Sequence, residues 1–329
     1  MGNVLVTGGA GYIGSHVARQ LGERGETLVT LDNLSTGFRG AVLHGELVQG
    51  DTGDAALVAR VLEAHGIDTV LHFAAHIQVP ESVANPLKYY RNNTANTRTL
   101  LECCVAAGVK HFVFSSTAAV YGMPPGGVAE ESTPTVPINP YGWSKLMSER
   151  MLADVAEVTP LRYVALRYFN VAGADPGGRI GQSTPEATHL IKVACEHAVG
   201  RRTGISIFGT DYETPDGTCV RDYIHVEDLA AAHLQALDYL RGGGASATLN
   251  CGYGRGFSVR EVLAEVARTA GTPLSVTESP RRAGDPPQLI AAARRIRDTL
   301  GWSPRHEDLP GIVATALAWE KRLLRQPMA

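Results

Sequence analysis

The sequence predicts an α/β fold, in which a doubly wound parallel sheet is joined to a smaller, mixed α/β C-terminal domain. Short apolar runs alternate with helix-like segments through the first half of the chain, which is typical of βαβ units with right-handed crossovers. A glycine-rich turn separates the first apolar run from the first helix-like segment. The alternation stops near residues 175–178, where proline and glycine mark a change of composition. We therefore expect a first domain over residues 1–172, joined by a return segment near 221–252, and a second mainly over 173–329.

Composition restricts the class of protein. The chain has 329 residues, 44% hydrophobic and 19% charged, which is ordinary for a globular protein with a full core. A net charge of -3 argues against a nucleic-acid binder, and no apolar run is long enough to cross a bilayer. Nothing at the N-terminus resembles a signal peptide. We expect a cytoplasmic, soluble protein without a metal and without a membrane or nucleic-acid partner. The five cysteines lack paired metal-binding spacing and indicate reduced thiols: Cys103, Cys104, Cys195, Cys219 and Cys251.

Hydrophobic periodicity locates the individual elements. Strands are expected at residues 3–7, 27–31, 46–49, 69–73, 111–117 and 162–167. Helices are expected from 15 to about 23, at 55–64 behind an Asp54 cap, along an amphipathic stretch at 86–107, and from 140 onward. Beyond the change of composition, helical patterns cover 188–199, 226–240, 259–270 and 309–324, with short strands between them.

The glycine turn has the context of a dinucleotide-binding fingerprint, because it follows a buried strand and opens a helix. Gly8 allows the tight turn, Gly11 lets the backbone approach a pyrophosphate, and Gly14 lets the helix pack closely on the strand. The N–H groups of the helix start would face the phosphates. Asp32 ends the second strand, where a Rossmann fold places the acceptor for the adenosine ribose hydroxyls. A carboxylate there repels a 2′-phosphate, so the pattern favours NAD over NADP.

Residues 139–145 predict a helix start that carries chemistry. Asn139 suits the N-cap and Pro140 the first helical position. Tyr141 and Lys145 then lie on one helix face, four residues apart. An ammonium beside a phenol stabilises the phenolate, so we expect the pKa of Tyr141 to fall from about 10 toward working pH. Such a tyrosine can exchange a proton with an alcohol. Taken alone, the pair also fits an exposed helix start with an ordinary tyrosine.

Polar side chains near other strand ends extend this hypothesis. The hydroxyl of Thr117, at the end of the fifth strand, can orient a substrate oxygen or merely cap the strand. His72 and His76 do not indicate a metal site, because no third ligand converges on them in the sequence. Arg221 and Arg282 suit an anionic ligand, since arginine binds phosphate with a planar fork. Exposed, solvated arginines are the alternative.

Together these motifs resemble those of the extended short-chain dehydrogenase/reductases and, within them, the UDP-glucose 4-epimerase group. The resemblance runs from Val4 to about Trp302. It rests on the segments TGGAGYIGSH (7–16), DNL (32–34), NPYGWSK (139–145), RYFN (167–170), VRDYIHV (220–226) and RRAGD (281–285).

The resemblance implies NAD as a tightly bound cofactor and assigns its contacts. Residues at the pyrophosphate would be Gly8, Gly11, Tyr12, Ile13 and Gly14. Those at the adenosine would be Asp32, Asn33, Asp51 and Thr52. The remaining cofactor contacts would be Phe73, Ala74, Ala75, Asn92, Ser115, Tyr141, Lys145 and Tyr168.

The resemblance also implies a UDP-hexose substrate. Tyr141 would be the acid/base, supported by Lys145, and Thr117 would hydrogen-bond the sugar 4-oxygen. Phe208 would stack near uracil, and Leu289 would border the sugar 2-substituent. Other substrate contacts would be Asn170, His189, Leu190, Arg221, Tyr223, Arg282 and Asp285.

The implied reaction is reversible epimerisation of UDP-galactose and UDP-glucose at C4 through a transient 4-keto sugar, with NAD as internal hydride carrier. Related dehydratases and decarboxylases carry an acid directly after the strand threonine, whereas this chain has Ala118 and Ala119. Two departures bear on substrate details: Ile77 stands where a lysine is common, and His189 where an asparagine is common.

Several alternatives remain open at this point. One is another NAD-dependent epimerase, acting on N-acetylhexosamine, uronate or pentose forms of the nucleotide sugar. A second is a dehydrogenase or reductase that releases its NAD(H). A third is a non-catalytic NAD-dependent binding protein on the same fold. The resemblance further implies a homodimer, assembled through the helices at 86–107 and 141–158.

Overall fold

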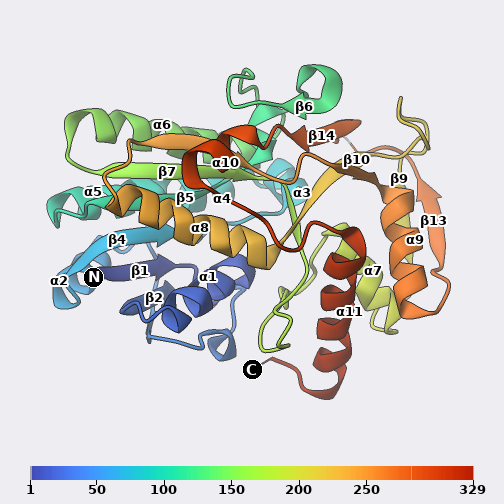
Figure 1. The fold of residues 1–329 in the computed structure, drawn as a ribbon, viewed down its shortest axis with the longest axis horizontal. Coiled ribbons are helices and arrows are strands. Elements are labelled where there is room, and N and C mark those ends of the chain that lie inside the picture. Colours follow the sequence, from blue (N-terminus) through green and yellow to red (C-terminus); the bar gives the residue numbers. More distant parts are fainter. Residues whose placement is uncertain (1, 283, 329) are drawn as a thin grey trace.

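A seven-stranded parallel sheet forms the largest part of the computed structural model, which describes residues 2–282 and 284–328 (Figure 1). Its strand order is β11-β7-β5-β4-β1-β2-β3, with the change of direction between β1 and β4 that a Rossmann fold requires. The strands are β1 (Asn3–Thr7), β2 (Leu28–Asp32), β3 (Glu46–Gln49), β4 (Ile67–His72), β5 (His111–Thr117), β7 (Arg162–Tyr168) and β11 (Ala247–Cys251). The predicted fold class is therefore confirmed, and six of these strands lie within two residues of their predicted bounds.

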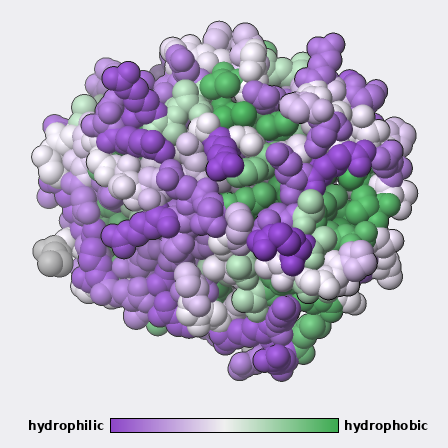
Figure 2. Space-filling model, turned by 45° about the vertical axis from the view of Figure 1, so that its right-hand side comes forward, coloured by the Kyte–Doolittle hydropathy of each residue, from purple (hydrophilic) through white to green (hydrophobic). Residues whose placement is uncertain are grey.

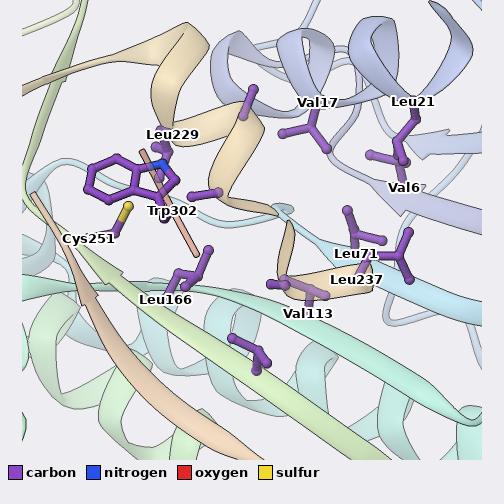
Figure 3. Close-up of a cluster of buried hydrophobic side chains, with 14 of the residues drawn as sticks. Val6, Val17, Leu21, Leu71, Val113, Leu166, Leu229, Leu237, Cys251 and Trp302 are labelled. Carbon is purple, nitrogen blue, oxygen red and sulfur yellow. The ribbon is translucent and has the colours of Figure 1, made fainter. Parts of the chain in front are cut away.

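Helices cover both faces of the sheet because side chains alternate along each buried strand. Val4 and Val6 of β1 face a core that includes side chains of α1 (Tyr12–Glu23), α8 (Val226–Arg241) and α10 (Arg294–Leu300), part of which Figure 3 shows. Leu5, between them, faces a second core with α2 (Ala55–Ala64), α5 (Asn96–Ala106) and α6 (Pro140–Val158). Both cores consist of closely packed, buried apolar side chains, which holds the strand ends in fixed positions.

The predicted amphipathic stretch at 86–107 is helical throughout but is not one regular helix. It consists of α4 (Pro86–Tyr89), a π-helix at Tyr90–Ala95 and α5, and α3 (Val79–Ala84) precedes it. The buried Asn93 lies in the π-helix. Its amide donates to the His76 carbonyl at 2.9 Å and to the Ser144 hydroxyl at 3.0 Å. The π-helix thus links the segment after β4 to α6.

The second half of the chain adds smaller sheets and a third core. One sheet has the order β12-β10-β14-β6, β8 pairs with β10, and β13 pairs with β9. The strands of these smaller sheets are β6 (Val128–Ala129), β8 (Asn170–Ala172), β9 (Ile205–Phe208), β10 (Val220–His225), β12 (Gly256–Ser258), β13 (Val276–Ser279) and β14 (Gln288–Ala291). The helices α7 (Leu190–Ala198), α9 (Val259–Ala270) and α11 (Leu309–Arg325) pack around the third core. Short 3₁₀ turns lie at Arg39–Ala41, Ala118–Tyr121 and Pro125–Gly127.

The surface in Figure 2 is mostly hydrophilic, with hydrophobic side chains in separate patches. All five cysteines are free thiols, as their spacing predicts. Within residues 2–282 and 284–328, no helix is long and apolar enough to cross a membrane.

Candidate active site

The turn between β1 and α1 leaves no room for a side chain at Gly8 or at Gly14. Gly8 has a φ of +70°, and a methyl group there would lie 2.6 Å from the Ala74 backbone nitrogen. A methyl group on Gly14 would lie 2.3 Å from the Gly8 carbonyl oxygen. Gly11 is the N-cap of α1, and among the described residues no side chain caps this helix start. Unpaired N–H groups at a helix N-terminus fit an anionic group such as a pyrophosphate, so the turn fits a dinucleotide.

Asp32 hydrogen-bonds the backbone of this turn on the side predicted to hold the adenosine. One carboxylate oxygen accepts from the Ala10 backbone N–H at 2.9 Å, and the other from the Leu34 backbone N–H at 2.8 Å. The side chain is almost fully buried, and burial raises the pKa of Asp32. A carboxylate oxygen has two lone pairs, so each oxygen that orders the turn can still accept a ribose hydroxyl.

A second polar cluster follows β3. The amide of Asn33 donates to Asp51 at 3.0 Å, and the amide of Asn96 donates to the other oxygen of Asp51 at 2.8 Å. Thr52 is buried beside it. The structure therefore brings together Asn33, Asp51 and Thr52, all predicted at the adenosine, and Asn96 of the helical stretch donates to the same carboxylate.

The start of α6 follows the predicted pattern. Asn139 is the N-cap, and its side-chain oxygen accepts from the Gly142 backbone N–H at 2.9 Å. Pro140 occupies the first turn. A methyl group on Gly142 would lie 2.7 Å from the Ala119 carbonyl oxygen. The first turn of α6 is thus held directly against the 3₁₀ turn that follows β5.

Tyr141 and Lys145 are both buried on this helix, with 7% and 2% of their surface exposed. The ammonium of Lys145 donates to the Ser115 carbonyl at 2.8 Å and lies 4.9 Å from the centre of the Phe114 ring. Burial lowers the pKa of Lys145 to about 7, and the carboxylate of Glu149 opposes this fall. The lysine is therefore fixed by the strand that ends at Thr117.

The predicted fall in the pKa of Tyr141 is wrong, because its surroundings in the protein raise this pKa instead. Burial raises the pKa to about 12, and the hydrogen bond with the Thr117 hydroxyl offsets only part of that rise. The ammonium of Lys145 is directed at the Ser115 carbonyl, while the edge of the Tyr89 ring packs against the Tyr141 ring with 6.4 Å between centres. Sequence spacing alone could not reveal how strongly burial penalises the phenolate.

The ends of β4, β5 and β7 lie side by side here, because β5 pairs with both neighbours. The hydroxyls of Ser115 and Tyr168 are hydrogen-bonded. Phe73, just after β4, packs against the His233 ring of α8 with 4.8 Å between centres, and Tyr168 packs against the same ring at 6.5 Å. Asn92 donates to Asn93 in the π-helix. These residues share the carboxyl edge of the sheet, where ligands bind in such folds.

Residues predicted at the sugar lie on the strands that leave this edge. Asn170 of β8 pairs in register with Tyr223 of β10. Arg221 of β10 is in register with Leu289 of β14. Leu289 packs against a small core that contains Ala118, the residue after Thr117.

Residues predicted at the nucleotide are more exposed. Phe208 ends β9 with 38% of its surface exposed, and the guanidinium of Arg282 lies 4.6 Å from its ring centre. Arg282 also donates to Asp285 at 2.9 Å. His189 is the N-cap residue of α7, next to Leu190, and its ring nitrogen pairs with the Gln182 amide at 2.9 Å. Burial lowers the pKa of His189, which favours its neutral form.

Comparison with known proteins identifies the family. A profile of the NAD dependent epimerase/dehydratase family matches residues 4–252.

The chain belongs to the NAD dependent epimerase/dehydratase family.

Its similarity to epimerases extends over the whole chain. A UDP-glucose 4-epimerase of Azospirillum brasilense is 60% identical over 321 residues, covering 97% of this chain and 92% of that protein. The crystal structure of UDP-glucose 4-epimerase from Brucella ovis in complex with NAD has a TM-score of 0.94 and 45% identity, covering 100% of this chain and 99% of that one. The UDP-Glc/GlcNAc 4-epimerase of Campylobacter jejuni has a TM-score of 0.86 and 48% identity, covering 98% and 100%. The resemblance predicted from the motifs is confirmed.

The epimerase fold contains one polar cluster beside the site that the motifs did not assign. Glu149 of α6 lies four residues after Lys145, and its carboxylate contacts Ser116 of β5 and Arg167 of β7. Tyr141, Lys145 and Glu149 follow one another at intervals of four residues, which places all three on one face of α6. This spacing could have revealed the cluster from the sequence. No group of three or more His, Cys, Asp or Glu side chains in the described residues could hold a metal ion.

Proposed function

We propose that this protein interconverts UDP-galactose and UDP-glucose at C4 with NAD held as an internal redox cofactor. The observation that carries the proposal is the convergence of Tyr141, Lys145 and Thr117 at the sheet edge that also carries the glycine turn. Curated relatives named UDP-glucose 4-epimerase support it, with identities of 60% and 48% over nearly the full length.

The chain's own residues would hold the cofactor and move one proton. The α1 N-terminus would bind the pyrophosphate, and Asp32 the adenosine ribose. Bound NAD would accept a hydride from the sugar C4 and return it. Tyr141 would take the proton of the 4-hydroxyl and later return it, while Lys145 would stabilise the phenolate with its charge. Thr117 would orient the 4-oxygen toward the phenol.

The substrate side would hold the nucleotide and leave the sugar free to turn. Arg221, Arg282 and Asp285 would bind the diphosphate and ribose, and Phe208 would stack near the uracil. The 4-keto sugar would rotate about its bonds to the diphosphate and present its other face. Binding energy from the distant nucleotide would hold the substrate while the sugar remains mobile. The other proposed substrate contacts are Asn170, His189, Leu190, Tyr223 and Leu289.

The residues after the strand threonine favour epimerisation over elimination. Ala118 and Ala119 form the first half of a 3₁₀ turn after Thr117, and neither can donate a proton to a leaving hydroxyl. A dehydratase needs such a donor at this place. The chemistry that remains is reversible oxidation at C4.

The decisive experiment gives UDP-galactose to the purified protein without added NAD and measures UDP-glucose. Turnover without added cofactor supports internal cycling. Stoichiometric consumption of added NAD would instead identify a dehydrogenase, and absence of any product would support a binding protein. Denaturing the protein and measuring NAD(H) in the supernatant provides the matched test for retained cofactor.

We further propose a homodimer in the cytoplasm. Val83, Leu87, Trp143 and Met147, on α3, α4 and α6, are apolar and from 40% to 76% exposed, which is unusual for a surface that remains in water. Light scattering should give twice the chain mass, and Leu87→Glu should reduce it. Five free thiols suit a reducing compartment. The division into an NAD-binding first domain and a sugar-nucleotide-binding second domain stays a prediction.

A further inference from the structure

A buried carboxylate connects the catalytic helix to two strands at the edge of the site. Glu149 lies on α6 and is 6% exposed. Its carboxylate accepts from Arg167 Nε at 2.9 Å and from Arg167 Nη2 at 2.5 Å. It also accepts from the Ser116 hydroxyl. Ser116 and Arg167 are direct neighbours in the β5–β7 pairing, so one side chain clamps two adjacent strands.

The clamped residues stand directly beside those proposed to act on the substrate. Ser116 lies between Ser115, whose carbonyl accepts from Lys145, and Thr117, whose hydroxyl contacts Tyr141. Because neighbouring side chains on a strand point to opposite faces, fixing Ser116 against α6 also fixes the side chains on either side of it.

The cluster extends away from the site and gives the clamp a rigid base. Arg167 Nη1 donates to the Tyr121 hydroxyl at 3.0 Å, and its guanidinium lies 5.0 Å from the Tyr121 ring centre. The Tyr121 hydroxyl donates in turn to Asn250 of β11 at 2.7 Å. Every one of these side chains is buried. Apolar residues of similar volume stabilise an interior as well as a buried ion pair does, so stability alone does not account for the cluster.

We infer that Glu149 is a positioning residue: through Ser116 and Arg167 it holds the end of β5 against the α6 face that carries Tyr141 and Lys145. The kinetic tests of this inference rest on the proposed function. Its structural test rests on the geometry alone. Glu149 also places a negative charge one turn from the Lys145 ammonium. Two other titratable groups face Tyr141 and Lys145: burial and the Lys145 charge lower the pKa of His72 on β4, and burial and Tyr141 raise the pKa of Tyr168 on β7.

Two single variants separate the clamp from the charge. Ser116→Ala removes one hydrogen bond and leaves the ion pair, and we expect kcat to fall about tenfold with KM unchanged, since small misplacements of reacting groups cost up to about 10²-fold. Glu149→Gln keeps the shape, removes the charge and replaces one acceptor oxygen by an NH2 donor, so it also weakens the contact with Arg167. We expect a larger loss of kcat, and a basic limb of the kcat/KM profile that moves to lower pH, because loss of the carboxylate lowers the pKa of Lys145.

Glu320→Gln is the matched control. Glu320 is a buried carboxylate paired with Lys192 and Arg201, on a helix that packs mainly against α7 and α9. It should lose thermal stability and keep the wild-type kcat and pH profile. The double variant Glu149→Leu/Arg167→Met replaces the pair by apolar groups; it should fold and still lose kcat.

Three results would overturn the inference. One is wild-type kcat and pH profile in a folded Glu149→Gln. If Glu149→Gln does not fold, a wild-type kcat in Ser116→Ala would overturn the inference instead. The third is a crystal structure of Ser116→Ala in which the 2.8 Å contact between Lys145 Nζ and the Ser115 carbonyl is unchanged. That structural readout also separates this inference from the proposed function, because it needs no turnover.

Discussion

The two sides of the proposed site, one toward NAD and one toward the uridine nucleotide, differ in how firmly the chain holds their residues. On the cofactor side, Tyr141 and Lys145 are 7% and 2% exposed, and strands of the seven-stranded sheet hold their neighbours. On the nucleotide side, Phe208 is 38% exposed and Arg282 is 43% exposed, both near short strands and turns. Groups that must meet a reacting atom need fixed geometry, whereas groups that bind a long, flexible ligand do not. We therefore expect variants on the cofactor side to change mainly kcat, and variants on the nucleotide side to change mainly KM.

The largest effect is expected from Tyr141→Phe. Removing the hydroxyl deletes the proposed acid/base, and kcat should fall about 10²–10⁴-fold. The protein should keep its circular dichroism spectrum and its NAD(H), because the phenyl ring still fills the buried site. Near-normal turnover in this variant would refute the assigned role. Tyr89→Phe, on the ring packed against Tyr141, is the control for a nearby tyrosine hydroxyl.

Lys145→Ala should be the next largest effect and should also change the pH profile. In the proposed mechanism the lysine charge favours the phenolate, so its loss would raise the pKa of Tyr141. More alkaline solution is then needed to form the phenolate, and the acidic limb of kcat/KM should move to higher pH. The measurement is the kcat/KM profile of both proteins across about pH 5–10. An unmoved acidic limb would mean that Lys145 does not tune the tyrosine.

Arg282→Ala tests the nucleotide side. A hydrogen bond to a charged group contributes about 1.5–3 kcal/mol, and partial exposure reduces this, so KM for UDP-galactose should rise about tenfold with little change in kcat. Arg281→Ala is the matched control, because Arg281 is paired with Asp211 and lies 4.2 Å from the Tyr212 ring centre. A large loss of kcat in Arg282→Ala would remove the contrast between the two sides.

The smallest effect concerns the sugar accepted. At its proposed place beside the sugar 2-substituent, Leu289 would leave room for an acetamido group but offer it no hydrogen-bond donor, and an unpaired buried amide costs about 1–3 kcal/mol. We expect UDP-galactose to be preferred over UDP-N-acetylgalactosamine, and Leu289→Tyr to reduce the residual N-acetyl activity further. Comparing kcat/KM for both substrates on both proteins decides this. Equal efficiency on the two substrates, or no loss in the variant, would show that Leu289 does not control access.

Local spacing was enough to predict one part of the site. An N-cap, a proline and an i,i+4 pair place Tyr141 and Lys145 on one helix face without any long-range information. The crossover rule likewise predicts that the ends of consecutive parallel strands meet at one edge, which brings Thr117 and Asp32 to the same side of the sheet.

Other features depend on contacts between segments far apart in the chain. The π-helix at Tyr90–Ala95 carries Asn93, whose bonds to His76 and Ser144 form only in the folded protein. The clamp at Glu149 needs residues from two strands. The pKa of Tyr141 depends on burial, which residue spacing does not report. These are the points at which prediction from the sequence stopped or was wrong.

The position of β11 at the edge of the main sheet has a consequence for the newly made chain. β11 pairs with β7 although about 80 residues separate their ends. The apolar core on that face also needs α8, Ile296 and Trp302. At a synthesis rate of about 5–20 residues per second, roughly 4–16 seconds pass between the end of β7 and the end of β11. During that interval the β7 edge has unpaired backbone groups and the sheet face lacks α8, so the growing chain is open to pairing with other chains.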